Sequence, residues 1–490
     1  MMRVAGLSMT PVSALRHRFM GARDTHSRLL HSSPQMQDTK TPREIPAEWL
    51  RLIMEDGTNP PKLYAWTPKN LSGGGGARFG SAEGTHGSSR DDDDDDRRRI
   101  YVLGVGNIGR LYAMCLSKIV NGPPITLVVH RRELLERWAA EPGIELTRRG
   151  QAHRNADFDI EWWTDAAPCG GHAAEVAAGR SISNLIVATK ASDALPQVDR
   201  VRRYLGSDST VAFAQNGMCK LWPPVGDGYV RARFPDGTSP SWIACVTTHG
   251  VTSQGPFKST HAAPANALVG PVMRSGVDRV GEEEQTGGYL MRQIASAPGL
   301  DARAVSRKEL WVAQLEKLVV NAIINPLTAV LRCQNGEILV ARDDALPDVI
   351  DRLLSEASET LSALIRDVAS DGILISESLN QETTSDNLVT ESLGVSRAQL
   401  LERFSFPRLR SMVLDVGVKV SANTSSMLQD VRAGKPTEID DFNGWLIGTA
   451  KLLDKGLQLP THEKLIALVK DQAALTRGEL CARLLAENYS

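Results

Sequence analysis

The stretch Ile100-Tyr-Val-Leu103-Gly104-Val-Gly106-Asn-Ile-Gly109-Arg110 decides the fold class of this 490-residue chain. Four apolar residues predict a buried strand, and the residues after them predict a helix over 107–120. The glycines have separate expected roles: Gly104 permits a tight turn, Gly106 lets the backbone approach a pyrophosphate, and Gly109 lets the helix pack closely on the strand. The motif stands between a strand and a helix, so it predicts dinucleotide binding. The expected cofactor contacts are Gly104, Val105, Gly106, Asn107, Ile108 and Gly109, where N–H groups at the helix start hold the anion.

Strand and helix patterns continue to alternate after this motif. Apolar runs at 100–104, 126–130, 185–189 and 210–214 predict strands, and 107–120, 134–140 and 193–205 predict helices. Such alternation is typical of a parallel α/β sheet. Further strands are expected within 241–272, a loop at 273–290, and helices from about residue 300 almost to the end, with a polar insertion at 371–395.

The end of the second predicted strand indicates which cofactor is bound. It reads His130-Arg131-Arg132-Glu133, whereas a site that prefers NAD usually has an acidic residue there to bind the ribose hydroxyls. An arginine suits a 2′-phosphate through charge-assisted hydrogen bonds, so we predict NADPH as the cofactor, with Arg131 as its phosphate ligand. The alternative is that an arginine faces solvent there, and Glu133 keeps NADH open.

A second informative stretch is Lys317-Leu-Val-Val-Asn321-Ala-Ile-Ile-Asn325-Pro326, where a cation and two amides recur every four residues. Positions i, i+4 and i+8 share one helix face, and the other faces are apolar, so the helix is expected to be buried. A buried ammonium beside two amides is costly unless a polar partner meets it, and a substrate could be that partner. The alternative is a core helix whose polar groups are satisfied by neighbouring loops. Pro326 should kink or end the helix.

Composition excludes several classes of protein. Lys plus Arg total 56 and Asp plus Glu total 58, which gives a formal net charge of −2 and no indication of nucleic acid or an anionic membrane as partner. The six cysteines include no C-x-x-C pair, which argues against a disulfide framework or a thiolate zinc site. No apolar run reaches the roughly 20 residues that a membrane helix needs.

The first 99 residues are expected to be a targeting segment followed by a disordered linker. Residues 1–23 are basic and rich in Ser and Thr, and they contain no acid, as in a mitochondrial presequence; an unstructured tail is the alternative. A few anchors, such as Leu63-Tyr-Ala-Trp66, could pack on the body as a strap. Residues 71–99 are Gly/Ser-rich and end in six aspartates and three arginines, which favours a flexible spacer. We therefore predict a mitochondrial protein, or otherwise a cytoplasmic one.

From about residue 100 to about residue 470 the chain resembles the ketopantoate reductase family, the 2-dehydropantoate 2-reductases. The combination of motifs is specific to that family. Besides the glycine loop it comprises Ala188-Thr-Lys190, Gln215-Asn216-Gly217, Trp311 with Glu316-Lys317, Asn321-x-x-x-Asn325-Pro-Leu-Thr-Ala329, Asn335-Gly336-Glu337, Ser425-Ser426-Met427-x-Gln429-Asp430, and Gly434-x-Pro436-Thr437-Glu438-Ile-Asp440. One departure is Pro460-Thr461-His462-Glu463, where the family usually has Pro-Thr-x-Asn.

The resemblance implies a fold and a division into domains. We expect an α/β fold with an N-terminal Rossmann-type NADP-binding domain at 100–300. An all-helical substrate and dimerisation domain is expected at 301–490, with the site in the cleft between the two. A homodimer is the candidate assembly, and the oligomeric state otherwise stays open.

The resemblance also implies an activity, the NADPH-dependent reduction of 2-dehydropantoate to (R)-pantoate in the pathway to pantothenate and coenzyme A. By motif, Lys317 is expected to be catalytic and Glu438 to anchor substrate beside it. Asn321 and Asn325 are expected to bind a substrate hydroxyl. The remaining expected site residues are Ser426 for the carboxylate, Asn216 for nicotinamide and substrate, Lys190 for the cofactor and Asn335 for the substrate.

The residues themselves suggest how such a reaction would proceed. Hydride transfer to a ketone leaves an alkoxide, so a positioned acid must supply a proton or a positive charge. The sequence contains no cluster of metal ligands, and Lys317 is therefore the candidate acid. Burial would lower its pKa and Glu438 would raise it. Two rival hypotheses remain: a reductase of another branched 2-oxo acid, and a non-catalytic NADPH-binding regulatory protein.

Overall fold

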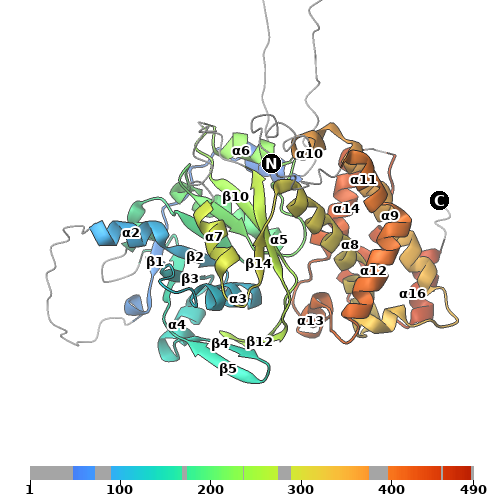
Figure 1. Ribbon diagram of the computed structural model, residues 1–490, viewed down its shortest axis with the longest axis horizontal. Helices are drawn as coiled ribbons and strands as arrows, with labels where there is room; N and C mark the ends of the chain where they lie inside the picture. The colour runs from blue at the N-terminus through green and yellow to red at the C-terminus, as the bar shows by residue number, and fades with distance from the viewer. Residues whose placement is uncertain are drawn as a thin grey trace, which may run out of the picture. The chain divides into compact units, whose positions relative to one another are not determined.

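The computed structural model describes residues 48–71, 90–167, 174–223, 225–235, 237–273, 288–374, 396–453 and 456–486, which belong to one compact unit. In this part of the chain an α/β half with a largely parallel sheet is followed by a helical region (Figure 1). The fold class expected from the sequence is thus confirmed.

A ten-stranded sheet forms the centre of the α/β half, in the order β14-β13-β10-β9-β8-β2-β3-β6-β1-β7. Its strands are β1 (Tyr64–Trp66), β2 (Ile100–Leu103), β3 (Ile125–Val129), β6 (Asp159–Thr164), β7 (Ala174–Glu175), β8 (Asn184–Val187), β9 (Thr210–Phe213), β10 (Ser241–Thr247), β13 (Ala267–Met273) and β14 (Ala302–Ala304). Strands β6, β3, β2, β8, β9 and β10 pair in parallel. Because β2, β3, β8 and β9 are buried at every residue, their sequences are nearly continuous apolar runs.

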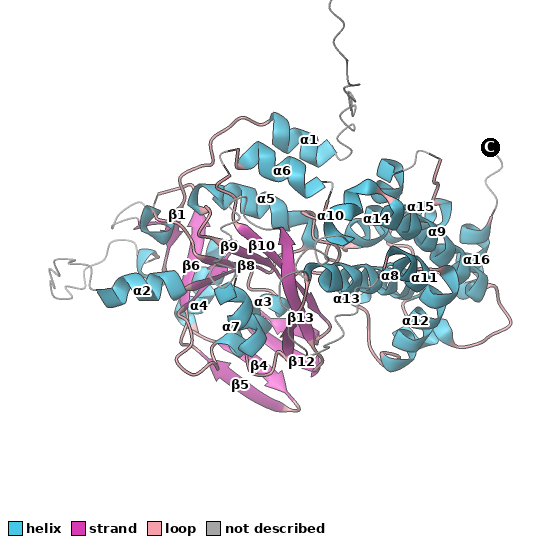
Figure 2. Ribbon diagram, turned by 45° about the horizontal axis from the view of Figure 1, so that its top comes forward, coloured by secondary structure: helices cyan, strands magenta, loops and turns pink. Residues whose placement is uncertain are grey.

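Helices cover both faces of this sheet, as Figure 2 shows. The helices on one face are α1 (Glu48–Glu55), α5 (Ala191–Val201) and α6 (Val225–Arg233), and those on the other are α3 (Asn107–Leu116), α4 (Arg132–Ala140) and α7 (Gly288–Ser296). Short 3₁₀ turns occur at Pro68–Asn70, Val176–Gly179 and Arg202–Tyr204. The predicted helices at 107–120, 134–140 and 193–205 correspond to α3, α4 and α5, with ends that differ by a few residues.

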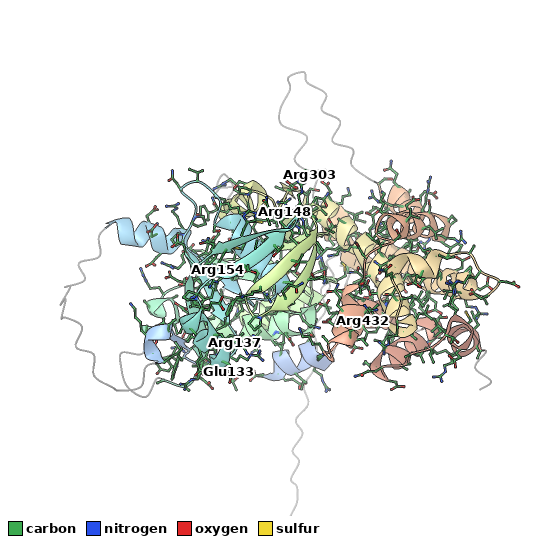
Figure 3. The ribbon with its side chains drawn as sticks, turned by 90° about the horizontal axis from the view of Figure 1, so that it is seen from below. Glu133, Arg137, Arg148, Arg154, Arg303 and Arg432 are labelled. Carbon is green, nitrogen blue, oxygen red and sulfur yellow. The ribbon has the colours of Figure 1, made fainter. Side chains whose placement is uncertain are left out.

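A second sheet, of four strands in the order β11-β12-β4-β5, was not predicted as a separate unit. It consists of β4 (Ile144–Arg148), β5 (Gln151–Asn155), β11 (Gly250–Gly255) and β12 (Lys258–Ala263). The β4–β5 hairpin is largely polar, so it shows no apolar run, and β12 joins it through parallel pairing with β4. Figure 3 shows Arg148 and Arg154 on this hairpin and Arg432 in the helical region.

The expectation that residues 1–99 are a targeting segment and disordered linker is too broad for the described part of that range. Strand β1 pairs with β6 and β7, and Leu50, Leu63 and Ala65 are buried in the core. Residues Arg90–Arg98 form helix α2 instead of a flexible spacer. Residues 1–47 and 72–89, which include the predicted presequence, lie outside the described residues.

The helical region begins with the long helix α8 (Arg307–Leu331). The other helices are α9 (Leu346–Arg366), α10 (Asp371–Leu374), α11 (Arg397–Arg403), α12 (Phe406–Lys419), α13 (Ser426–Arg432), α14 (Ile439–Leu453), α15 (Pro460–Lys470) and α16 (Arg477–Leu485), with 3₁₀ turns at Asn335–Leu339 and Val368–Ser370. Helix α8 continues for five residues past Pro326, so of the two expected effects of this proline, a kink or an end, the structure excludes the end. The predicted loop at 273–290 and insertion at 371–395 fall mostly outside the described residues.

Candidate functional site

The glycine loop connects β2 to α3, and its geometry explains each glycine. Gly104 has φ +98°, a conformation that other residues rarely adopt. A Cβ at Gly109 would lie 2.0 Å from the carbonyl oxygen of Gly104, so only glycine allows this close packing of helix on loop. A Cβ at Gly106 would meet nothing within 4 Å. Packing therefore does not require glycine at 106, but close approach of a ligand would.

A cavity with a volume of about 620 Å³ lies beside this loop. Its lining includes the predicted cofactor residues Gly104, Val105, Gly106, Arg131 and Lys190. Other lining residues come from helix α5 and from the tip of the β11–β12 hairpin, namely Asp193, Gln197, Arg200, Val201, Ser253, Gly255, Pro256 and Phe257. Asn107, Ile108 and Gly109 form the first turn of α3 and are not part of the lining. The cavity thus has the position that a dinucleotide takes at the carboxyl ends of parallel strands.

Arg131 lies at the N-cap of α4 with 58% of its side chain exposed, and its Nε is 4.0 Å from a carboxylate oxygen of Glu133. Such a loose, exposed pair holds the guanidinium weakly. Burial, followed by the charge of Arg131, lowers the pKa of His130. At neutral pH the positive charge at this end of the cavity therefore comes from the arginine.

Lys190 connects the cavity to the helical region. Its ammonium donates a hydrogen bond to Asp430 Oδ2 at 2.9 Å and another to the carbonyl oxygen of Pro436. Lys190 follows β8 and Asp430 belongs to α13, so this contact joins the edge of the sheet to the segment that carries Glu438.

A second polar cluster surrounds Lys317. Its ammonium donates to Asn216 Oδ1 at 2.9 Å and to the carbonyl oxygen of Thr247 at 2.6 Å. The Asn216 amide then donates to Glu438 Oε2 at 3.2 Å. Asn216 thus bridges the lysine and the glutamate, which come from α8 and from the residue just before α14.

The sheet topology explains why these groups meet. Strands β2, β8, β9 and β10 are neighbours, and the glycine loop, Lys190 and Asn216 follow the first three of them. The last β9–β10 pair is Ala244 with Phe213, so Thr247 extends three residues beyond it and its carbonyl is available to the lysine. At roughly 4.8 Å per strand, the loop and Thr247 are about 14 Å apart along this edge.

The environment of Lys317 shifts its acidity. Burial lowers its pKa to about 8, and the charge of Glu438 partly opposes that shift. Burial also raises the pKa of Glu438, while its hydrogen bond from Asn216 and the charge of Lys190 act in the opposite direction. The cluster therefore contains an ammonium that titrates close to neutral pH.

The remaining predicted residues lie further along α8 and beside it. Asn325 is buried and donates to Ser426 Oγ at 3.4 Å, at the start of α13. Asn335 is buried, and its Oδ1 has no hydrogen-bond partner among the described residues. Its backbone N–H donates to Asn423, three residues before Ser426. Asn321 is partly buried, four residues from Lys317 along the helix.

Sequence reasoning missed two groups at these clusters. Thr247 acts through its backbone carbonyl, which no pattern of residue types reveals. Arg110 lines the cavity and is buried, and its only signal was a basic residue directly before the apolar run of α3. Within the described residues no three His, Cys, Asp or Glu side chains are grouped to hold a metal. None of the described helices combines the length and the apolar character that a membrane span requires.

Two family patterns match most of the chain. Residues 100–274 match the family described as Ketopantoate reductase PanE/ApbA. Residues 309–473 match Ketopantoate reductase PanE/ApbA C terminal. The first match contains the glycine loop, Asn216 and Thr247, and the second contains Lys317 and Glu438.

Three relatives illustrate the range of similarity. The chain is 42% identical to ketoisovalerate reductase BEA2 of Gibberella fujikuroi, over 89% of this chain and 98% of that protein. It is 39% identical to ketoisovalerate reductase of Beauveria bassiana over the same shares. A probable 2-dehydropantoate 2-reductase of Schizosaccharomyces pombe is 28% identical, over 78% of this chain and 99% of that protein.

A solved structure shows the same fold at lower sequence identity. The ternary structure of D-mandelate dehydrogenase with NADH and anilino(oxo)acetate covers 76% of this chain and 98% of its own, with a TM-score of 0.52 and 15% identity. At this identity the likeness concerns the fold alone.

Proposed function

The chain belongs to the ketopantoate reductase family, and we propose that it is an NADPH-dependent reductase of branched 2-oxo acids, with 2-ketoisovalerate as its preferred substrate. The substrate assignment follows the two relatives near 40% identity, both ketoisovalerate reductases that align over almost their whole length. The assignment of an oxidoreductase acting on a 2-oxo acid depends on the family and on the cluster around Lys317.

One observation carries the proposal: the Lys317 ammonium is fixed between Asn216 and Thr247 at the same sheet edge as the glycine loop. A 2-oxo acid reductase needs an acid there, because its substrate oxygen becomes an alkoxide as the hydride arrives. When bound, the cofactor supplies that hydride. With a pKa of about 8, Lys317 is protonated at neutral pH, yet it is acidic enough to transfer its proton to the substrate oxygen.

Glu438 and Asn216 tune and orient this acid. The carboxylate of Glu438 favours the charged ammonium, and the Asn216 side chain touches both groups and fixes their separation. We propose that Glu438 also accepts a hydrogen bond from substrate and that Asn216 reaches both substrate and nicotinamide. A regulatory protein without catalysis would have no need of a titrating lysine held by two acceptors.

Ketopantoate is the second candidate substrate. It carries a hydroxyl group that 2-ketoisovalerate lacks, and Asn321 and Asn325 offer both donors and acceptors for such a group. The 28% identical relative from Schizosaccharomyces pombe supports this candidate. In either case Ser426, exposed at the start of α13, and Asn335 are proposed to bind the polar end of the substrate.

The test is a set of steady-state assays with the purified full chain. NADPH oxidation is followed with 2-ketoisovalerate, ketopantoate and 2-oxobutanoate, each from below to above KM. We expect kcat/KM for 2-ketoisovalerate to exceed that for ketopantoate at least tenfold. A reversed order would assign the chain to ketopantoate reduction, and no turnover with any of the three acids would refute the enzymatic proposal.

The proposal includes the location and the assembly of the protein, and the proposed activity depends on neither. The basic segment at 1–23 supports import into mitochondria, which a fluorescent fusion of residues 1–34 would test by microscopy. The helical region at 301–490 is proposed to form a homodimer, which light scattering would show as twice the chain mass of 53.3 kDa.

A further inference from the structure

Arg110 is a buried cation at the glycine loop to which the proposed function assigns no role. It is the fourth residue of α3, directly after Gly109, and only 6% of its surface is exposed. It nevertheless contributes to the lining of the cofactor cavity. Its neighbours in α3, from Leu111 to Leu116, are apolar or aromatic and buried. A guanidinium in such surroundings requires a reason, because charged side chains are rarely buried without a partner.

The hydrogen bonds of Arg110 go to backbone carbonyl groups in two segments, the glycine loop and the β11–β12 hairpin. Its Nε donates to the carbonyl oxygens of Val105 at 3.1 Å and Gly106 at 3.2 Å, within the glycine loop. Its Nη1 donates to the carbonyl oxygens of Gly255, at 2.8 Å, and Lys258, in the β11–β12 hairpin. The guanidinium is therefore fixed in place, with its charge directly beside the loop.

None of these four acceptors carries a charge. Within the described residues no Asp or Glu forms an ion pair with Arg110, and burial lowers its pKa to about 10 without any opposing acid. At neutral pH it thus remains a cation whose charge no carboxylate of the described residues compensates. Removing a charge from water is costly unless an opposite charge meets it.

The cavity itself does not supply that opposite charge. Among the described residues Asp193 is the one acidic side chain in its lining, against Arg110, Arg131, Lys190, Arg200 and Lys435. Of these cations Lys190 is already paired with Asp430. Nη2 of Arg110 has no hydrogen-bond partner among the described residues, so one end of the fork can still donate. An anionic ligand in the cavity would supply both the charge and the acceptor.

A purely structural role is the alternative, in which Arg110 only ties the hairpin to the loop. Other contacts already make that connection: Asn107 donates to the carbonyl oxygen of Val251, and Ser259 donates to Asn107 Oδ1. These contacts are uncharged, and they join the start of α3 to the same hairpin. The hairpin is therefore joined to the start of α3 by contacts other than those of Arg110.

We propose that Arg110 is a cofactor-binding residue whose fixed positive charge stabilises the diphosphate of the dinucleotide at the glycine loop. The proposal rests on the dinucleotide-binding part of the proposed function and adds a second cation with a separate task. Arg131 would distinguish NADPH from NADH through the 2′-phosphate, whereas Arg110 would bind the diphosphate that both cofactors share. Because a guanidinium stays charged, its contribution should be independent of pH over the working range.

The test compares Arg110→Gln with Arg110→Lys by direct titration of NADH, NADPH and 2′-AMP, without any 2-oxo acid. Gln retains an amide donor but no charge, whereas Lys retains the charge with fewer donors. We expect Arg110→Gln to weaken NADH and NADPH about tenfold each and to leave 2′-AMP, which has no diphosphate, within twofold of the wild type. Arg110→Lys should restore most of the affinity for both dinucleotides. The affinity for NADH should fall less steeply with salt concentration in Arg110→Gln than in Arg110→Lys.

Folding is checked by thermal melting of each variant, so that lost structure is not mistaken for lost charge. Equal affinity of the wild type and Arg110→Gln for NADH would overturn the role of Arg110. The role would also be overturned if Arg110→Lys melts normally but binds NADH as weakly as Arg110→Gln, because that pattern indicates a geometric support. If the wild type binds neither dinucleotide, the proposed function fails as well, so the two failures can be told apart.

Discussion

Arg110 in α3 and Lys317 in α8 are both enclosed cations at the carboxyl edge of the same sheet, but their surroundings differ. Lys317 has a carboxylate close by, since Asn216 links it to Glu438, and its ammonium titrates near pH 8. Among the described residues Arg110 has neutral carbonyl acceptors alone, and its pKa of about 10 keeps it charged at neutral pH.

The difference separates two uses of a buried positive charge. A proton donor must lose its proton at an accessible pH, which requires an amine whose charged form is only slightly favoured. An anchor for a permanent anion must keep its charge under all working conditions, which requires a guanidinium. We infer that the first kind of group stands where the substrate oxygen changes charge, and the second where the ligand charge is constant.

The largest expected effect comes from removing the titrating group. Lys317→Ala should lower kcat by about 10²–10⁴-fold because the alkoxide loses its proton donor. Dissociation constants for NADPH, measured by fluorescence titration, should change less than threefold. Lys317→Arg keeps a charge but not an accessible pKa, so it should restore little of the rate. A Lys317→Arg variant with near wild-type kcat would show that a positive charge alone suffices at this position, so that Lys317 and Arg110 would not differ in function. Lys451→Ala, at an exposed lysine, is the control.

The next effect concerns the pH dependence that Glu438 sets. In the proposed mechanism reduction requires protonated Lys317, so kcat/KM should be level below pH 8 and fall about tenfold per pH unit above it. The charge of Glu438 raises the pKa of Lys317; Glu438→Gln removes that charge, and the falling limb should move to lower pH. Rate profiles from pH 6 to pH 10 test this. A limb that stays in place would mean that the two groups are not electrostatically coupled.

The third expected effect is on cofactor affinity at the far end of the cavity. Arg131→Ala should weaken NADPH about 10- to 100-fold, which corresponds to about 1.5–3 kcal/mol for a hydrogen bond to a charged group. NADH should be unaffected, because it lacks the 2′-phosphate. Titrations of both cofactors provide the ratio, and Arg132→Ala, whose guanidinium pairs with Glu136, is the matched control. Equal losses for both cofactors would assign Arg131 to the shared diphosphate and so to the role proposed for Arg110.

Local pattern was sufficient for the parts of the fold that are regular and buried. The apolar runs of β2, β3, β8 and β9 and the spacing of Lys317, Asn321 and Asn325 follow from strand and helix periodicity. It was insufficient where tertiary contacts override local preference. Helix α8 continues through Pro326, which has no N–H for the helix ladder and lies buried in the core.

In the N-terminal region, tertiary contacts produce a strand that the local sequence does not predict. Strand β1 has only three residues. The apolar run at Leu63–Trp66 marked this segment as an anchor on the body, but it did not predict a strand within the sheet. It becomes a strand because β6 and β7 offer unpaired edges on either side of it. The β4–β5 hairpin is likewise stabilised by pairing with β12, more than a hundred residues later.

The sequence by itself determined that a dinucleotide loop follows the first strand of a parallel sheet, and that a lysine and two amides share one helix face. Both depend on spacing between residues that are near one another in the chain. Only the tertiary structure decided that Asn216 stands between Lys317 and Glu438 and that a backbone carbonyl of Thr247 holds the ammonium. It also decided that Arg110 meets no acidic partner in the part of the chain that the structure describes. Those facts depend on which distant segments meet, and on the dielectric that their packing creates, so no local pattern encodes them.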